Sequence, residues 1–322
     1  MEQSPDVFLA LGKRGLRYIR TSLNPLPSAT FPDYRYALNL KECLWFMWQK
    51  SLGLLYRIKN RALVVWKYKK DYWLMPAPEL WVRCGSYYPA FTVSVPHLHK
   101  AKVMDVESTE MIWDRDVSVG ADAIPTGPYA TFIDESAHDH PDYDVVGKHA
   151  PVDAETYFKG LRNFFDKVSE DLNLPVVIAA HPKSNYTDQQ KKDWFGDRKV
   201  ISGITPTLIR KCNLVLAHAS TAISYAVLNK KPVFILTSND FEKSYVKDNL
   251  LHLSFRLGQK RINVDDFCGS DDPVLNMPFV DLKGYEKYVH LFLRSPRVRK
   301  ECIWKTIAIQ FEALLEKNDK NI

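Results

Sequence analysis

The stretch Val176–Ser184, VVIAAHPKS, joins an apolar run to a histidine, a proline and a lysine. Its β-branched start predicts a strand that is covered on both faces, as in a parallel sheet flanked by helices. In open sheets of this kind, ligands bind just outside the carboxyl ends of the strands. His181, Pro182 and Lys183 therefore lie where polar side chains often take part in chemistry.

The same pattern of short apolar strands and helical segments continues on both sides of this stretch. Strands are predicted at residues 129–134, 175–181, 200–201, 214–218 and 232–238. Helices are predicted at residues 154–172, 188–195, 205–212, 220–230 and near 240–250. Alternation of this kind indicates βαβ units, so we expect an α/β fold with a parallel, doubly wound sheet.

The first part of the chain has a less regular pattern. Residues 1–60 read as helical or irregular, with an amphipathic helix beginning at residue 40, and short strands are predicted at 62–68, 79–85 and 101–108. Turn-forming residues cluster at 125–128, and we place a domain boundary there, between domains 1–128 and 129–322. The last helix, 297–317, is expected to cross back to the first domain.

The composition is that of a globular protein, with 46% hydrophobic and 25% charged residues. The five cysteines are scattered and form no CxxC pair, which argues against a disulfide framework and a zinc ribbon. No apolar stretch approaches the roughly 20 residues that span a bilayer. The charges at the start are the reverse of a signal peptide, so we expect a cytoplasmic protein.

The net charge is +6, and basic residues concentrate between Lys13 and Lys70 among several aromatic ones. Such a surface suits an anionic membrane face or a polyanion. A solvated face over a tryptophan-rich core is the other interpretation of this segment.

Three polar motifs follow predicted strands, and parallel strands place their carboxyl ends at one edge of a sheet. The motifs are FIDESAHDHPDYD (132–144), AAHPKSNY (179–186) and AHASTAISYA (217–226). We therefore expect them to be neighbours.

The second and third motifs are suited to binding a phosphate. Ser220 is a natural N-cap, and with Thr221 it opens a helix whose free N–H groups attract anions, although plain capping explains one hydroxyl equally well. His181 can donate a hydrogen bond to phosphate, Pro182 fixes the turn that aims it, and Lys183 adds a cation. A purely structural histidine is the alternative.

The first motif supplies carboxylates. Asp134 or Glu135 is expected to face the cleft between the domains and to accept a proton from an acceptor hydroxyl. The loop that follows holds candidate metal ligands, namely His138, Asp139, His140 and Asp142. Because no HExxH or DxD-like motif accompanies them, we expect no metal.

Residues 129–238 resemble bacterial GT-B glycosyltransferases that use CMP-activated sugars, most of all capsular polysialyltransferases and related sialyl-, Kdo- and nonulosonate-transferases of capsule and lipopolysaccharide synthesis. The resemblance lies in the order of the carboxylate pair, the His-Pro motif and the Ser-Thr pair. It implies two Rossmann-like domains with parallel sheets facing a central cleft. The N-terminal domain, short or atypical here, would bind the acceptor, and the C-terminal one the nucleotide-sugar.

The resemblance also implies roles for single residues. Asp134 would be the general base, with Glu135 in reserve, and the CMP phosphate would contact His181, Ser220 and Thr221. Gly203, Ile204 and Thr205 would lie near the cytosine. Two departures are Ser136, where the family pattern has glycine, and Ser-Thr in place of Ser-Ser.

The activity implied is an inverting, metal-independent transfer from a CMP-sugar to a glycan or glycolipid, without a cofactor or nucleic acid. The protein would work in the cytoplasm, with peripheral contact at the inner face of the cytoplasmic membrane as a further expectation. Three alternatives stay open: a CDP-glycerol- or CDP-ribitol-type phosphotransferase, a non-catalytic nucleotide- or glycan-binding protein, and a metal-dependent hydrolase built on His138, Asp139 and His140.

Overall fold

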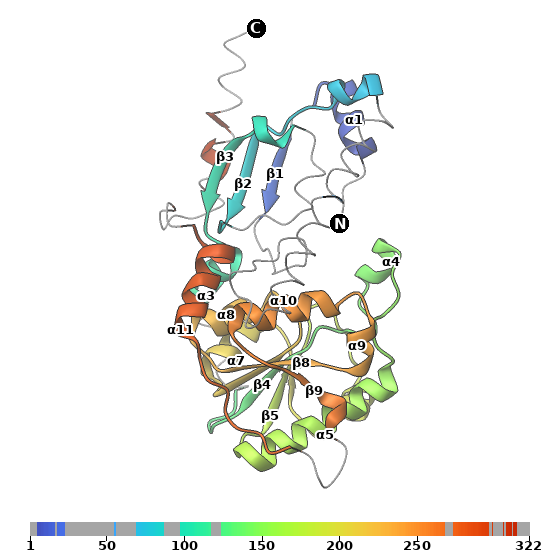
Figure 1. Cartoon of the computed structure of the whole chain (residues 1–322), viewed down its shortest axis with the longest axis vertical. Coiled ribbons are helices and arrows are strands. Elements are labelled where there is room, and N and C mark those ends of the chain that lie inside the picture. Colours follow the sequence, from blue (N-terminus) through green and yellow to red (C-terminus); the bar gives the residue numbers. More distant parts are fainter. Residues whose placement is uncertain are drawn as a thin grey trace. The chain divides into compact units, whose positions relative to one another are not determined.

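The computed structural model shows two compact units, one made of Met1–Ile112 with Val289–Ile322 and the other of Trp113–Tyr288 (Figure 1). The residues it describes are 5–16, 18–22, 55, 69–86, 97–116, 124–267, 273–295, 298, 305, 307–310, 312 and 313. The domain division at residues 128 and 129 stays a prediction.

Six strands of the unit Trp113–Tyr288 form one parallel sheet in the order β6-β5-β4-β7-β8-β9. They are β4 (Ala130–Ile133), β5 (Val176–Ala179), β6 (Val200–Ile201), β7 (Leu214–Ala217), β8 (Val233–Thr237) and β9 (Arg261–Asn263). Numbered along the chain, the order is 3-2-1-4-5-6, the doubly wound arrangement whose switch point lies between β4 and β7. The predicted parallel α/β sheet is confirmed.

Helices cover both faces of this sheet (Figure 1). On one face lies α5 (Ala154–Leu172), with α6 (Asp188–Phe195) packed against it. On the other lie α7 (Thr205–Lys211), α8 (Ile223–Leu228), α10 (Lys247–Leu257) and α11 (Leu282–Tyr288). Every residue of β4, β5, β7 and β8 is buried, which explains their largely apolar sequences.

Helix α5 fixes the position of the loops around the sheet edge. It begins at its N-cap Asp153, whose side chain accepts from the Thr156 N–H. In its middle, Gly160 touches the short helix η6 (Val264–Asp266), and a Cβ at this position would lie 2.7 Å from Oδ1 of Asp265. An alanine at this position would require the Asp265 side chain to move.

The smaller unit contains a three-stranded parallel sheet in the order β1-β2-β3. Its strands are β1 (Ile19–Ser22), β2 (Leu80–Cys84) and β3 (Lys102–Val106), and its described helices are α1 (Pro5–Lys13), η2 (Lys69–Leu74), η4 (Leu98–Lys100) and the start of α3 (Thr109–Asp116). Leu80, Val82 and Val106 form a small core, against which Ile307 packs. The predictions at 79–85 and 101–108 are confirmed, and β1 was not predicted.

The chain returns to this smaller unit through a π-helical turn, η7 (Val289–Leu293). The N–H of Ser86, just after β2, donates to the carbonyl oxygens of His290 and Leu291 at 3.1 and 3.0 Å. Gly85, with φ +64°, adopts the left-handed conformation that glycine tolerates, and leaves no room for a Cβ against the Leu291 carbonyl.

Some predicted elements differ from those observed. The helix predicted at 240–250 is two helices, α9 (Asn239–Lys243) and α10, and β9 and α11 were not predicted. The strand at 62–68, most of the basic segment from Lys13 to Lys70 and most of the helix at 297–317 lie outside the described residues. Within the part of the chain that the structure describes, no helix has the length and apolar character needed to span a bilayer.

Candidate functional site

The three polar motifs lie along one edge of the larger sheet. Asp134 follows β4, His181 comes two residues after β5, and Ser220 comes three residues after β7. Because β4 lies between β5 and β7 and all three strands are parallel, their carboxyl ends are adjacent. The expectation that the motifs are neighbours is confirmed.

Asp134 is buried, and both of its carboxylate oxygens accept hydrogen bonds. Oδ1 accepts from the Ser136 N–H at 2.9 Å, and Oδ2 accepts from the His181 N–H at 3.2 Å and the Tyr186 hydroxyl at 2.7 Å. These bonds join the loops that follow β4 and β5. The arrangement suits a residue that holds the site in place.

Ser136 has φ +50°, in the left-handed region. A residue with a side chain pays a steric cost there that glycine avoids. The backbone at Ser136 therefore has a conformation that glycine would adopt at lower cost. The turn brings the Ser136 N–H onto Asp134.

Glu135 has a different environment from Asp134. Its Oε1 is buried and has no hydrogen-bond partner among the described residues. Burial, followed by the negative charge of Asp134, raises the pKa of Glu135 to about 8. Its charge in turn contributes to the raised pKa values of Tyr143 and Tyr157, which places it among tyrosine side chains. A carboxyl group of this kind exchanges its proton near neutral pH.

His218, directly after β7, is a structural residue. Its ring is fully buried, with Nδ1 2.9 Å from the Leu236 carbonyl oxygen and Nε2 2.8 Å from the Tyr157 hydroxyl. Since a carbonyl only accepts, Nδ1 carries the hydrogen and Nε2 accepts from Tyr157. Burial lowers the pKa of His218 to about 4, so the ring is neutral. It ties α5, β7 and β8 together.

His181 and His140 meet edge to face, with ring centroids 4.7 Å apart. The Nδ1 of His181 accepts from the Lys183 N–H at 3.2 Å, so in the neutral ring the hydrogen is on Nε2. Burial, and then the neighbouring His140, lower the pKa of His181. His181 is therefore a neutral hydrogen-bond donor at the sheet edge.

Lys183 forms an ion pair with Asp142, with Nζ and Oδ1 2.8 Å apart and both side chains about half exposed. The hydrogen bond from Lys183 is the main reason why the pKa of Asp142 is lowered. Pro182, which is exposed, lies in the turn between His181 and Lys183. The lysine contacts a carboxylate here, so a bound phosphate would compete with Asp142 for it.

The segment after β7 corrects one prediction. Helix α8 begins at Ile223 with Ala222 as its N-cap, so Ser220 is not the N-cap. Instead, Ser220 Oγ accepts from the Ala222 N–H at 3.3 Å and closes a turn before the helix. A serine hydroxyl can accept from a backbone N–H in a turn, two residues later, as readily as from an N–H at the start of a helix. The sequence pattern does not distinguish these two cases. Thr221 is exposed.

The segment after β6 is open. Gly203 has φ +81°, and a Cβ there would meet no atom within 4 Å. Thr205 is the first residue of α7, whose N-cap Ile204 makes no side-chain hydrogen bond. The predicted cytosine contact at 203–205 stays a prediction.

The loop proposed as a metal site is split between two environments. His138 packs edge to face on Phe158 and Trp194, at centroid distances of 4.9 and 4.3 Å. His140 instead meets His181. Among the described residues, no three His, Cys, Asp or Glu side chains are grouped so that they could hold a metal ion.

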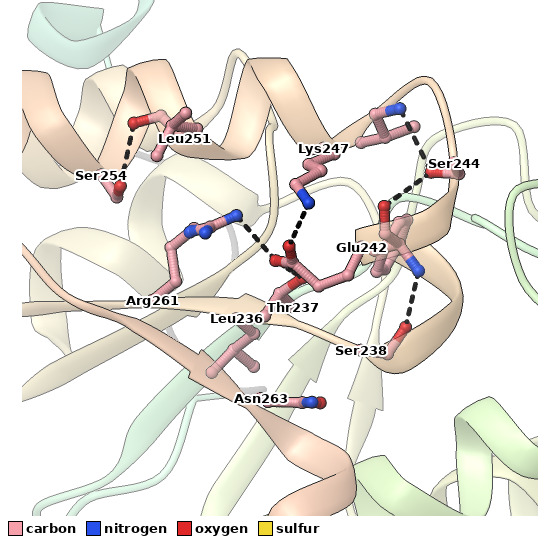
Figure 2. A network of polar contacts seen from close by, with 12 residues as sticks. Leu236, Thr237, Ser238, Glu242, Ser244, Lys247, Leu251, Ser254, Arg261 and Asn263 are labelled. Atoms are coloured by element: carbon pink, nitrogen blue, oxygen red, sulfur yellow. Dashed lines mark hydrogen bonds and ion pairs between the residues drawn. The ribbon is translucent and has the colours of Figure 1, made fainter. Parts of the chain in front are cut away.

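A polar network joins the carboxyl end of β8 to the first residue of β9 and to the helices that follow β8. Figure 2 shows Arg261 and Lys247 converging on the carboxylate of Glu242, at 2.6 and 3.4 Å. The hydroxyl of Thr237 donates to the same carboxylate at 3.0 Å, and Ser238 caps α9. With three donors on Glu242, this network holds the loop after β8 in place.

Several solved structures are similar to this chain, and three of them are described below. No protein-family model matches the chain, and no curated protein matches its sequence. CalG4, the calicheamicin glycosyltransferase, has 12% identity and a TM-score of 0.40, over 80% of this chain and 58% of that one. The spinosyn forosaminyltransferase SpnP has 11% identity and a TM-score of 0.37, over 88% and 63%. The glycotransferase of kitacinnamycin has 10% identity and a TM-score of 0.38, over 80% and 60%. The chain thus spans about three fifths of the length of these structures.

Proposed function

We propose that this chain is a metal-independent glycosyltransferase that moves a sugar from a CMP-activated donor to a hydroxyl of a glycan or glycolipid. The observation that carries the proposal is Glu135, a carboxyl group with a raised pKa beside the switch point of a doubly wound sheet. Ligands of such sheets bind in the crevice outside this point, and perturbed carboxyl groups there are candidates for acid–base chemistry.

In this proposal Glu135, the reserve candidate from the sequence, is the general base. Glu135 accepts the proton in its ionised form, which is the minor form below its pKa of about 8. The acceptor oxygen bonds to the anomeric carbon of the donor, its proton passes to this carboxylate, and the bond to phosphate breaks, with its electrons leaving on CMP. A base on the face opposite the leaving group gives inversion. Asp134 is a positioning residue, because both of its oxygens already accept hydrogen bonds within the loops.

His181 contacts the departing phosphate in this mechanism. Its neutral Nε2–H donates a hydrogen bond to an oxygen on which negative charge develops. Lys183 lies two residues away and can exchange Asp142 for the phosphate. On the far side of the switch point, Ser220 and Thr221 provide hydroxyls that can bind the phosphate. Gly203 leaves room for the cytosine of the nucleotide.

The sugar and acceptor belong to the same proposal: sialic acid, Kdo or a related nonulosonate, added to a cell-surface polysaccharide or glycolipid. Support comes from the resemblance over residues 129–238. We place the work at the inner face of the cytoplasmic membrane, through the basic segment from Lys13 to Lys70.

Calorimetric titration with CMP, CDP and UMP in EDTA tests the nucleotide site. We expect CMP to bind, the His181→Ala variant to lose most of this affinity, and the His149→Ala variant to match the wild type, because His149 is exposed on a neighbouring loop. Preference for CDP would favour the glycerol- or ribitol-phosphate reaction. Absence of cytidine nucleotide binding would overturn the proposal.

A further inference from the structure

The loop after β4 carries a histidine, His140, that the proposed mechanism does not use. Its ring lies edge to face with His181 at 4.7 Å. We propose that His140 and His181 form a paired-donor site for one phosphate group, in which His140 supplies a second hydrogen bond. The contact between the two rings supports a phosphate site by itself. That this phosphate belongs to a nucleotide rests on the proposed function.

The backbone sets the same tautomer in both rings. The Asp142 N–H donates to His140 Nδ1 at 3.1 Å, as the Lys183 N–H donates to His181 Nδ1 at 3.2 Å. An Nδ1 that accepts an N–H bears no hydrogen, so in each neutral ring the hydrogen is on Nε2. Neither Nε2 has a protein acceptor among the described residues. Two adjacent donors suit a ligand rich in acceptor oxygens, and they disfavour a metal ion, which needs a bare nitrogen.

The charges around the pair favour an anion of this size. Asp142 is the nearest carboxylate, with Oδ2 3.9 Å from His140 Nδ1, and Lys183 balances it at 2.8 Å. Asp134 also faces His181, but its carboxylate is engaged by three donors. Burial and the proximity of His140 keep His181 largely uncharged in the free protein. The neutral rings can therefore offer their Nε2–H groups to a phosphate while each Nδ1 keeps its backbone hydrogen bond.

The two rings are held in place before any ligand arrives. They lie on the loops after β4 and β5, which are neighbouring parallel strands. The bond from the His181 N–H to Asp134 and the ion pair between Lys183 and Asp142 join these loops twice. Binding therefore requires little ordering of side chains, which conserves affinity.

The test uses three ligands and two matched variants of the full chain. Inorganic phosphate reports on the pair alone, CMP reports on the nucleotide site, and cytidine lacks the phosphate. His140→Phe keeps a planar ring but removes the donor, and His149→Phe makes the same change at an exposed position on the neighbouring loop. Affinities come from calorimetry, and ¹⁵N nuclear magnetic resonance of the ring nitrogens reads the tautomers.

We expect His140→Phe to weaken phosphate and CMP binding about tenfold, as the loss of one charge-assisted hydrogen bond predicts. Cytidine binding and the His149→Phe variant should match the wild type. Phosphate binding that depends on His140, without CMP binding, would support the pair and overturn the proposed function. CMP binding that needs His181 but not His140 would overturn the pair alone. No binding of either anion, or an Nδ1–H tautomer in either ring, would also overturn the pair.

Discussion

Glu135 makes a prediction about stability that needs no substrate. Its pKa is about 8 in the folded protein, against the ordinary value of 4.5 for an exposed glutamate. Between these values the folded state holds a proton that the unfolded state has released. The free energy of unfolding therefore falls as pH rises, by about 1.4 kcal/mol per pH unit at the full slope. The Glu135→Gln variant has no such proton and lacks this slope.

The expected size follows from the two pKa values. Between pH 5.5 and pH 7.5 the free energy of unfolding of the wild type should fall by about 2 kcal/mol relative to that of Glu135→Gln. The slope is slightly reduced as the pH nears the folded pKa of Glu135. Every other titrating group is common to both proteins and cancels in the difference. Glu155→Gln, which changes an exposed carboxyl on α5, is the control and should keep the wild-type slope.

Hydrogen exchange of peptides covering β4 and β7 measures the result, because these strands lie in the core of the unit that holds Glu135. Rates are corrected for the intrinsic effect of pH at each point. If the free energies of opening of the wild type and of Glu135→Gln differ by a constant amount from pH 5.5 to pH 7.5, the claim that Glu135 is protonated in the folded state is refuted.

Three further predictions concern the same unit. Gly160→Ala should not show the roughly 1 kcal/mol by which alanine stabilises a helix interior relative to glycine, because its Cβ would lie 2.7 Å from an Asp265 oxygen and that side chain would have to move. Urea unfolding measures the difference, with Gly127→Ala, whose Cβ would meet open space, as the control. The folded pKa of His218, about 4, is below the ordinary value of 6.5, so the contribution of this residue to the free energy of unfolding is full above pH 6.5 and falls by about 2 to 3 kcal/mol toward pH 4.5. A His218→Gln variant with the same acid dependence in urea unfolding would contradict this. Lys183→Met should change the free energy of unfolding by less than about 1 kcal/mol, because its ion pair is exposed, but should weaken CMP binding several-fold in calorimetry; unchanged affinity would remove Lys183 from the phosphate site.

The buried strands could be predicted from the sequence because they are covered on both faces. β5 and β8 are largely apolar runs, and their burial is what the run encodes. β9 has the sequence RIN and only half-buried residues at the sheet edge, so no apolar pattern marks it. Strand β1, IRTS, escaped prediction for the same kind of reason.

The roles within the site could not be assigned from sequence alone. Asp134 and Glu135 are adjacent and chemically alike, and their difference arises from Tyr186, a residue 52 positions later, and from the His181 N–H. The contact between His140 and His181 likewise depends on β4 and β5 being neighbours. What the sequence did predict is the edge on which these groups meet, since each one follows a predicted strand.

The most direct measurement is release of CMP from CMP-sialic acid and CMP-Kdo, with a glycan acceptor and EDTA, by the wild type and Glu135→Gln. The account predicts acceptor-dependent release by the wild type, a loss of about 10²- to 10⁴-fold in Glu135→Gln, and unchanged CMP affinity in that variant. Equal turnover by the two proteins, or no turnover of any CMP-sugar by a wild type that binds CMP, would contradict it.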